Sequence, residues 1–183
     1  MLLGVASIAG AQDVWDLART TISGKRVAIE YGRPKLNGRT LDSLMKQLPP
    51  DRIWRAGAGP LTVLTTETDL LVGGKKVPAG SYSLYMHCPE KGNYALVINR
   101  DLGELTGTVL EKATPDRSNR PYPHFMDYTM GIADKELARI PLTQKPSKRT
   151  EILIYDFEPS GNGSLLTISW GDQAWTVEFQ PAT

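Results

Sequence analysis

The fold class is decided by residues 151–179, which read EILIYDFEPSGNGSLLTISWGDQAWTVEF. Residues 151–157 are apolar on both parities, which is typical of a central strand covered on two faces. Apolar and polar residues then alternate over 166–170 and over 175–179, as they do in half-buried strands. Gly and Asn at 160–163 and 171–173 suit turns. The pattern predicts three antiparallel strands in a meander.

The middle of the chain repeats this rhythm of short strands separated by turns that contain Gly or Pro. Strands are expected at residues 61–66, 70–72, 75–77, 81–87 and 94–99. Short strands at such spacing are typical of an antiparallel sandwich or barrel. The sequence therefore predicts an all-β fold, an antiparallel β-sandwich with one or two short helices.

Two segments interrupt the strand pattern. Between Thr40 and Leu48 apolar residues recur at helical spacing, and prolines follow at once, which predicts a short helix. The segment from Lys112 to Arg149 holds five prolines, and a second short helix is expected near residues 133–140. A connection this long is either functional or loosely ordered.

The composition is that of a soluble, globular protein. The chain has 183 residues, of which 40% are hydrophobic and 22% charged, and its formal net charge is +1. This length suits one domain, expected over residues 12–183. The balanced charge provides no general attraction for nucleic acid, so no nucleic-acid partner is predicted.

The first eleven residues indicate export. Leu2 to Ala11 form an apolar run that ends in Ala9-Gly10-Ala11, as the cleavage site of a secretory signal peptide does. The run is shorter than the about 20 residues that span a bilayer, so no integral membrane segment is expected in the mature chain. No basic residue precedes the run, and the alternative is that it forms the first strand of the domain. The expected location is periplasmic or secreted.

Three blocks in a fixed order resemble a bacterial family. They are Tyr31-Gly-Arg-Pro34 with Asn37-Gly-Arg39, Trp54-Arg-Ala-Gly-Ala58, and Gly74-Lys-Lys-Val-Pro-Ala-Gly-Ser-Tyr-Ser-Leu-Tyr85. With the strand that follows, to Asn99, they resemble the family catalogued as domain of unknown function 2911. The resemblance implies an exported bacterial protein and no assigned activity. In the family pattern the Trp-Arg block continues into Asn-Glu, whereas this chain has Gly59-Pro60.

Arginine and aromatic side chains are concentrated in the first two blocks. The candidate ligand-binding residues are Tyr31, Arg33, Arg39, Trp54 and Arg55. A guanidinium group offers a rigid fork for carboxylate or phosphate and stacks on aromatic rings, so this set suits an anionic or sugar-like ligand. The alternative is that the arginines hold loops against the sheet by pairing with Glu30, Asp42 or Asp51.

The two histidines are the other candidates for chemistry. His87 shares a strand face with Ser83 and Tyr85, and it could act as a general base in a cleft or be a partly exposed strand residue. His124 falls in the long connection. Their spacing matches no zinc motif, and neither a metal site nor a cofactor is predicted.

Two carboxylates and the cysteine are the last candidates for chemistry. Glu30 and Asp156 fall within expected strands and could form the carboxylate pair of a glycosidase. Cys88 is the only cysteine, which excludes an intrachain disulfide and a cysteine-based zinc cluster. We expect Cys88 to be a small buried hydrophobe rather than a catalytic thiol.

Two hypotheses of function follow. The first is a non-enzymatic, exported module that binds a small molecule or a protein, because no nucleophile, base and metal set assembles from the sequence. The second is a hydrolase acting on a carbohydrate or ester through carboxylates or His87, near Trp54 and Arg55. Structural pairing of Arg33, Arg39 and Arg55 would favour the first hypothesis, and their convergence on a pocket would favour the second.

Overall fold

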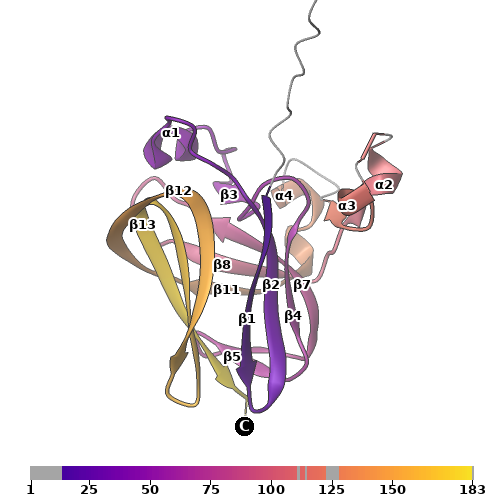
Figure 1. The fold of residues 1–183 in the computed structure, drawn as a ribbon, viewed down its shortest axis with the longest axis vertical. Helices are drawn as coiled ribbons and strands as arrows, with labels where there is room; N and C mark the ends of the chain where they lie inside the picture. The colour runs from indigo at the N-terminus through magenta and orange to yellow at the C-terminus, as the bar shows by residue number, and fades with distance from the viewer. Residues whose placement is uncertain (1–13, 111, 114, 123–127, 183) are drawn as a thin grey trace, which may run out of the picture.

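The protein is a sandwich of antiparallel β-sheets (Figure 1). This computed structural model describes residues 14–110, 112–113, 115–122 and 128–182. The helices are α1 Leu41–Met45, α2 Thr106–Val109, α3 Pro115–Ser118, α4 Tyr128–Gly131 and the 3₁₀ helix η1 Ala133–Lys135. The strands are β1 Val14–Ile22, β2 Lys25–Arg33, β3 Ile53–Trp54, β4 Thr62–Thr66, β5 Leu70–Val72, β6 Lys75–Val77, β7 Gly80–His87, β8 Ala95–Asn99, β9 Glu104–Leu105, β10 Pro121–Tyr122, β11 Glu136–Pro141, β12 Thr143–Ser160 and β13 Gly163–Pro181.

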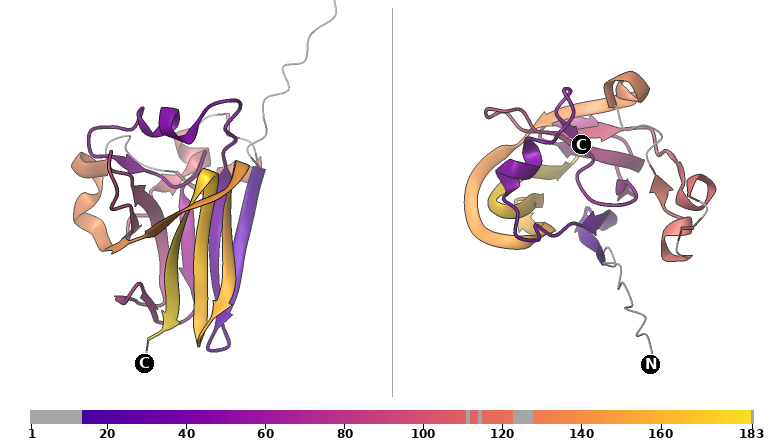
Figure 2. Two further views of the ribbon diagram at one scale, coloured as in Figure 1. Left: turned by 90° about the vertical axis from the view of Figure 1, so that its left-hand side faces the viewer. Right: turned by 90° about the horizontal axis from the view of Figure 1, so that it is seen from above.

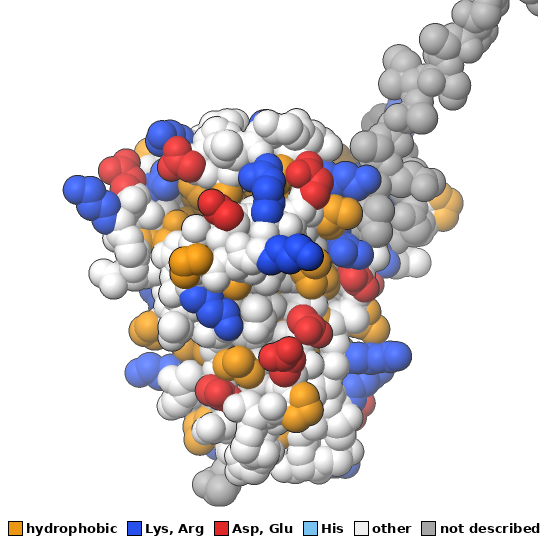
Figure 3. All heavy atoms as spheres, turned by 60° about the vertical axis from the view of Figure 1, so that its left-hand side comes forward, with side chains coloured by type: hydrophobic (Ala, Val, Ile, Leu, Met, Phe, Trp, Pro, Cys, Tyr) orange, Lys and Arg blue, Asp and Glu red, His pale blue; other side chains and the backbone are white. Residues whose placement is uncertain are grey.

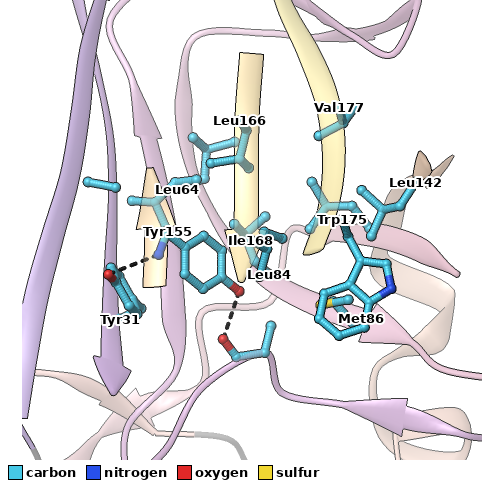
Figure 4. Packing of buried hydrophobic residues seen from close by; sticks show 14 of the residues in the cluster. Tyr31, Leu64, Leu84, Met86, Leu142, Tyr155, Leu166, Ile168, Trp175 and Val177 are labelled. Carbon is cyan, nitrogen blue, oxygen red and sulfur yellow. Dashed lines mark hydrogen bonds between the residues drawn. The ribbon is translucent and has the colours of Figure 1, made fainter. Parts of the chain in front are cut away.

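Two sheets enclose the main core. The large sheet has the order β1-β2-β4-β7-β8-β11, with β3 paired to β7, and the small sheet has the order β12-β13-β5-β6. Figure 4 shows Leu64 and Leu84 of the large sheet among Leu166 and Ile168 of the small sheet, and all four side chains are completely buried. The predicted all-β sandwich with short helices is therefore confirmed.

The C-terminal stretch forms one long hairpin, so the predicted three-strand meander is wrong. β12 and β13 pair from Thr143↔Thr176 to Ser160↔Gly163, with the expected turn between the last two residues. Residues 171–173 do not turn the chain, because they lie inside β13. The chain can continue as one strand because the pairing with β12 shifts register beside them, as at a β-bulge.

β12 also differs from the strand that the sequence predicts. It is an edge strand of the small sheet, and it curls around one side of the molecule when seen from above (Figure 2). Leu153 and Tyr155 are buried, whereas Asp156 is exposed and Ile152 and Ile154 are half-buried. Only one face of residues 151–157 is therefore well covered. The half-buried Ile152 and Ile154 point to the other face of this edge strand.

The strands expected in the middle of the chain are present as β4 to β8, each within one residue of its predicted ends. Tyr82, Leu84 and Met86 of β7 point into the main core. Tyr85, on the opposite face, joins a second apolar cluster with Val97, Tyr128 and others. Tyr128 comes from the excursion between β8 and β11, so part of the long connection covers the outer face of the large sheet. β7 is consequently buried on both faces.

The expected first helix is present and the second is not. In α1, the Thr40 hydroxyl accepts a hydrogen bond from the Ser43 N–H at 3.1 Å, the usual N-cap arrangement. Residues 133–135 form a single 3₁₀ turn, and residues 136–141 form β11 at the edge of the large sheet. Pairing with β8 satisfies the backbone groups on one side of this segment and overrides its local helical pattern. The predicted signal peptide, residues 1–11, lies outside the described residues.

Candidate functional site

A hollow of about 580 Å³ opens beside α1, and we call it the α1 hollow. Its lining residues are Leu41, Asp42, Met45, Lys46, Arg52, Pro89, Glu90, Lys91, Tyr94, Gln144, Asp172 and Gln173. These residues come from α1, the loop before β3, the loop before β8, the start of β12 and the middle of β13. Its volume lies in the range of about 300–1,000 Å³ that is usual for small-molecule sites.

The irregular part of β13 shapes this hollow. Gly171 has φ 63°, a left-handed conformation that glycine adopts without steric cost. A Cβ at this position would lie 3.1 Å from Cβ of Leu41, so α1 packs closely on the glycine backbone. The bulge leaves Trp170 and Ala174 buried and turns Asp172 outward. Bulges often redirect side chains beside functional sites, and here Asp172 and Gln173 reach the hollow.

The charges in the α1 hollow balance. Lys46, Arg52 and Lys91 face Asp42, Glu90 and Asp172, and the Lys46 ammonium lies 2.7 Å from the Asp42 carboxylate. On the face shown in Figure 3, acidic and basic side chains are interspersed rather than gathered by sign. The hollow therefore offers polar groups of both kinds without a net field.

A second hollow, of about 680 Å³, lies beside β11, and we call it the β11 hollow. Its lining residues are His87, Gly92, Asn93, Tyr94, Ala95, Arg139, Pro141, Leu142 and Gln144. Burial lowers the pKa of His87, and the positive charge of Arg139 adds to this effect. Arg139 itself donates two hydrogen bonds to the Glu136 carboxylate, at 3.0 and 2.9 Å.

The two hollows share Tyr94 and Gln144 as a common wall, and together they form what we call the Tyr94 groove. The Tyr94 ring contacts the buried Trp175 ring at 5.2 Å between centroids, and the Tyr94 carbonyl accepts a hydrogen bond from the Leu142 N–H at 2.8 Å. Two groove residues, Arg52 and Asn93, have positive φ of 58° and 56°. Such conformations are uncommon for residues other than glycine and gather at ligand sites.

Tyr31 and Arg33, two of the candidate residues from the sequence, lie where the two sheets meet. The Tyr31 hydroxyl accepts a hydrogen bond from the Tyr155 N–H at 3.0 Å (Figure 4). Arg33 forms an ion pair with Asp16 at 3.1 Å and donates to the Leu153 carbonyl at 3.3 Å. Both side chains connect strand β2 to β12.

Arg39, Trp54 and Arg55 also make contacts within the protein. Arg39 donates to the Leu36 carbonyl at 2.8 Å, Trp54 stacks on Trp170 at 5.2 Å, and Arg55 donates to the Gly59 carbonyl at 3.1 Å. None of the five candidates lines either hollow of the Tyr94 groove. Trp54 and Arg55 are neighbours in the sequence. Arg33 and Arg39 make their hydrogen bonds with other segments, to the carbonyl groups of Leu153 and Leu36. The partners shown for these arginines are mainly carbonyl groups, not the carboxylates named from the sequence.

The histidines, the two carboxylates and the cysteine are the remaining candidates from the sequence. His87 lines the β11 hollow, whereas His124 lies outside the described residues. Glu30 and Asp156 are both exposed and belong to different sheets, and Glu30 forms an ion pair with Arg120. Cys88 is buried as expected, and burial raises the pKa of its thiol to about 12.

Sequence reasoning does not find most of the Tyr94 groove. Tyr94, Gln144, Asp172 and Gln173 come from three separated segments with no common motif. One signal was available: Trp170 and Trp175 are large apolar residues at an odd spacing around a glycine, which in one strand requires a bulge.

Among residues 14–110, 112–113, 115–122 and 128–182, no three His, Cys, Asp or Glu side chains are grouped to hold a metal ion. Within the same part of the chain, every helix is too short or too polar to cross a membrane.

Comparison with known proteins identifies a family. No curated protein and no solved structure matches the chain. The family described as "Protein of unknown function (DUF2911)" matches residues 15–179. The matched range contains nearly all of both sheets, every lining residue of the Tyr94 groove and the three sequence blocks that indicate the resemblance. The chain therefore belongs to the DUF2911 family of proteins of unknown function.

Proposed function

We propose that this protein is an exported bacterial β-sandwich that binds a small ligand in the Tyr94 groove and does not transform it. The observation that carries the proposal is that two hollows of about 580 and 680 Å³ share one wall, made by Tyr94 and Gln144. A ligand lying across this wall would contact both hollows at once. The rigid support of Tyr94 by Trp175 reduces the entropy lost on binding.

The lining of the groove supports binding without catalysis. Among the described residues, no Ser, Thr or Cys lines either hollow, so the groove lacks the usual alcohol and thiol nucleophiles. Cys88 lies close by in sequence, but its thiol is buried with a pKa of about 12 and is therefore protonated and unreactive at neutral pH.

Export is supported by the apolar run at residues 2–11 and its small-residue end. Intact-mass analysis of the protein from the exported fraction of a bacterial host tests this part. We expect a mature chain that starts near Gln12, and a chain that keeps Met1 there would remove export by a cleaved signal peptide.

The binding proposal is tested by ligand-observed NMR with a library of small polar compounds. Gln144→Ala removes one of the two side chains in the shared wall. The control is Gln180→Ala, which removes an exposed glutamine near the end of β13. We expect hits that bind wild type and Gln180→Ala equally and bind Gln144→Ala about tenfold more weakly. Hits that all bind the three proteins equally, or no hits at all, would contradict binding in the groove.

A hydrolase is the second candidate, and one observation favours it: His87 lines the β11 hollow with a pKa below the usual value. Such a histidine is neutral at pH 7 and can take a proton from water. The test is hydrolysis of 4-nitrophenyl acetate and 4-nitrophenyl glycosides by wild type and His87→Gln. A rate that His87→Gln abolishes, and that rises through a pKa below 6.5 in wild type, would establish the hydrolase.

A further inference from the structure

We propose that the ligand of the Tyr94 groove is a neutral oligosaccharide, with one sugar unit in each hollow and the shared Tyr94 wall between them. This inference rests on the proposed function and specifies the chemical class of its ligand.

The charge of the α1 hollow argues for a neutral ligand. Three basic and three acidic side chains line it, so an anion and a cation would each meet a repelling partner beside an attracting one. Hydroxyl groups, which donate and accept, can use both signs at once. Carboxylate, guanidinium and amide groups also present donors or acceptors in pairs, which match the neighbouring hydroxyls of a sugar ring.

The amide groups of Gln144 and Gln173 contact neighbouring side chains but are not saturated. The side-chain amide of Gln144 donates a hydrogen bond from Nε2 to Oε1 of Gln173 at 3.0 Å. Nε2 of Gln173 in turn lies 3.4 Å from Oδ1 of Asp172. Among the described residues, these contacts leave the Gln144 carbonyl oxygen and the second Asp172 oxygen as acceptors. The contacts place these groups beside one another at the rim of the α1 hollow.

The wall between the hollows is aromatic and half-buried. The C–H groups on the face of a sugar ring are weakly positive, and the face of an aromatic ring is negative, so a sugar can pack on Tyr94. In the β11 hollow, Ala95, Pro141 and Leu142 add apolar surface. A sugar unit, with one apolar face and a polar rim, fits this mixture.

Isothermal titration calorimetry of the mature protein tests the inference with five probes. The probes are chitotetraose, cellotetraose and maltotetraose as neutral sugars, tetragalacturonate as an anionic sugar, and tetra-alanine as a peptide. We expect at least one neutral tetrasaccharide to bind with Kd below about 1 mM, and its disaccharide to bind about tenfold more tightly than its monosaccharide because it fills both hollows.

Variants locate the binding. Tyr94→Ala and Asp172→Asn should each weaken it about tenfold, whereas Asp156→Asn, an exposed aspartate elsewhere on the small sheet, should leave it unchanged. If tetragalacturonate or tetra-alanine binds in a manner sensitive to Asp172→Asn while the neutral sugars do not bind, the ligand class is wrong but the groove still binds ligand. If no probe binds, the sugar inference fails, and the NMR screen decides the proposed function separately. Sugar binding that neither groove variant weakens would also overturn the inference.

Discussion

Trp170 and Trp175 both point into the main core, although five positions separate them on one strand. In a regular strand, residues at an odd separation face opposite sides. The change of parity occurs at Gly171, which has φ 63°, and the pairing with β12 shifts register beside it. One glycine therefore keeps both indole rings inside and places Asp172 at the Tyr94 groove.

The first prediction concerns this glycine. Gly171→Ala puts a side chain on a left-handed residue and 3.1 Å from Leu41 Cβ, so we expect a loss of about 1–3 kcal/mol in the free energy of unfolding. Urea denaturation measures it. Gly161→Ala, at a left-handed turn position with nothing within 4 Å of the new Cβ, is the control and isolates the cost of the backbone conformation. Equal losses at both positions would show that contact with α1 contributes nothing.

The second prediction concerns Trp175, which is 1% exposed. Trp175→Ala should lower the free energy of unfolding by about 3–5 kcal/mol because it leaves a cavity under Tyr94. The indole N–H of Trp175 has no hydrogen-bond partner among the described residues. Trp175→Phe should therefore cost much less, since it keeps most of the packing and removes an unpaired donor. A loss below about 1 kcal/mol for Trp175→Ala in denaturant unfolding would contradict the buried position.

The third prediction concerns Arg55, which donates a hydrogen bond to the Gly59 carbonyl at 3.1 Å. Arg55→Ala should lower the free energy of unfolding by about 1.5–3 kcal/mol, the range for a hydrogen bond that involves a charged group. Arg26→Ala is the matched control, because Arg26 is exposed and forms only a surface ion pair with Glu67, worth about 0–1 kcal/mol. An Arg55→Ala protein with an unchanged urea midpoint and slope would show that Arg55 does not hold this loop.

The fourth prediction concerns the hydroxyl of Tyr31. Tyr31→Phe leaves the buried Tyr155 N–H without its acceptor, and an unsatisfied buried donor costs about 1–3 kcal/mol. Tyr82→Phe is the control, since its hydroxyl donates to the part-buried Pro78 carbonyl, which water can reach more easily. Thermal and urea unfolding should therefore show the larger loss for Tyr31→Phe. The reverse order would mean that this link between the sheets is not stabilising.

The fifth prediction concerns alkaline pH. Burial raises the pKa of Tyr85 from its ordinary value of 10.0 to about 12, so the folded state favours the protonated phenol. Its contribution is fully present below pH 10, where the unfolded chain would also be protonated, and is lost as the pH rises from 10 through 12. A shift of this size corresponds to about 2–3 kcal/mol. Urea unfolding at pH 9 and pH 11.5 should show a smaller decline for Tyr85→Phe than for wild type, and equal declines would contradict the shift.

Much of the sandwich was predictable because its middle strands follow a period of two. β4 to β8 match their expected bounds within one residue, since one face of each is apolar and all their connections except residues 67–69 carry Gly or Pro. The prediction of a helix near residues 133–140 is wrong because local spacing cannot show that β8 offers an edge to which β11 can pair. The prediction of a turn at residues 171–173 is wrong because glycine serves both turns and bulges.

The candidate site was less predictable than the fold. Guanidinium chemistry makes Arg33, Arg39 and Arg55 candidates for ligand binding, yet in the structure each donates a hydrogen bond to a backbone carbonyl group. The Tyr94 groove depends on how α1, the loop before β8 and the β13 bulge approach one another. Because these segments are far apart in the sequence, no single stretch predicts that they come together.

The pairing of β13 with β5 bears on the order in which the protein can fold. Phe179 pairs with Val72 across more than half of the chain, and its completely buried ring belongs to the main core. A nascent chain that has reached only β8 lacks the entire β12–β13 layer, so its apolar inner face stays open. The two sheets cannot close on each other until β13 has been synthesised. Contacts as distant in sequence as those between β13 and β5 form slowly, over about milliseconds to seconds. During that interval the chain remains open to chaperones and proteases.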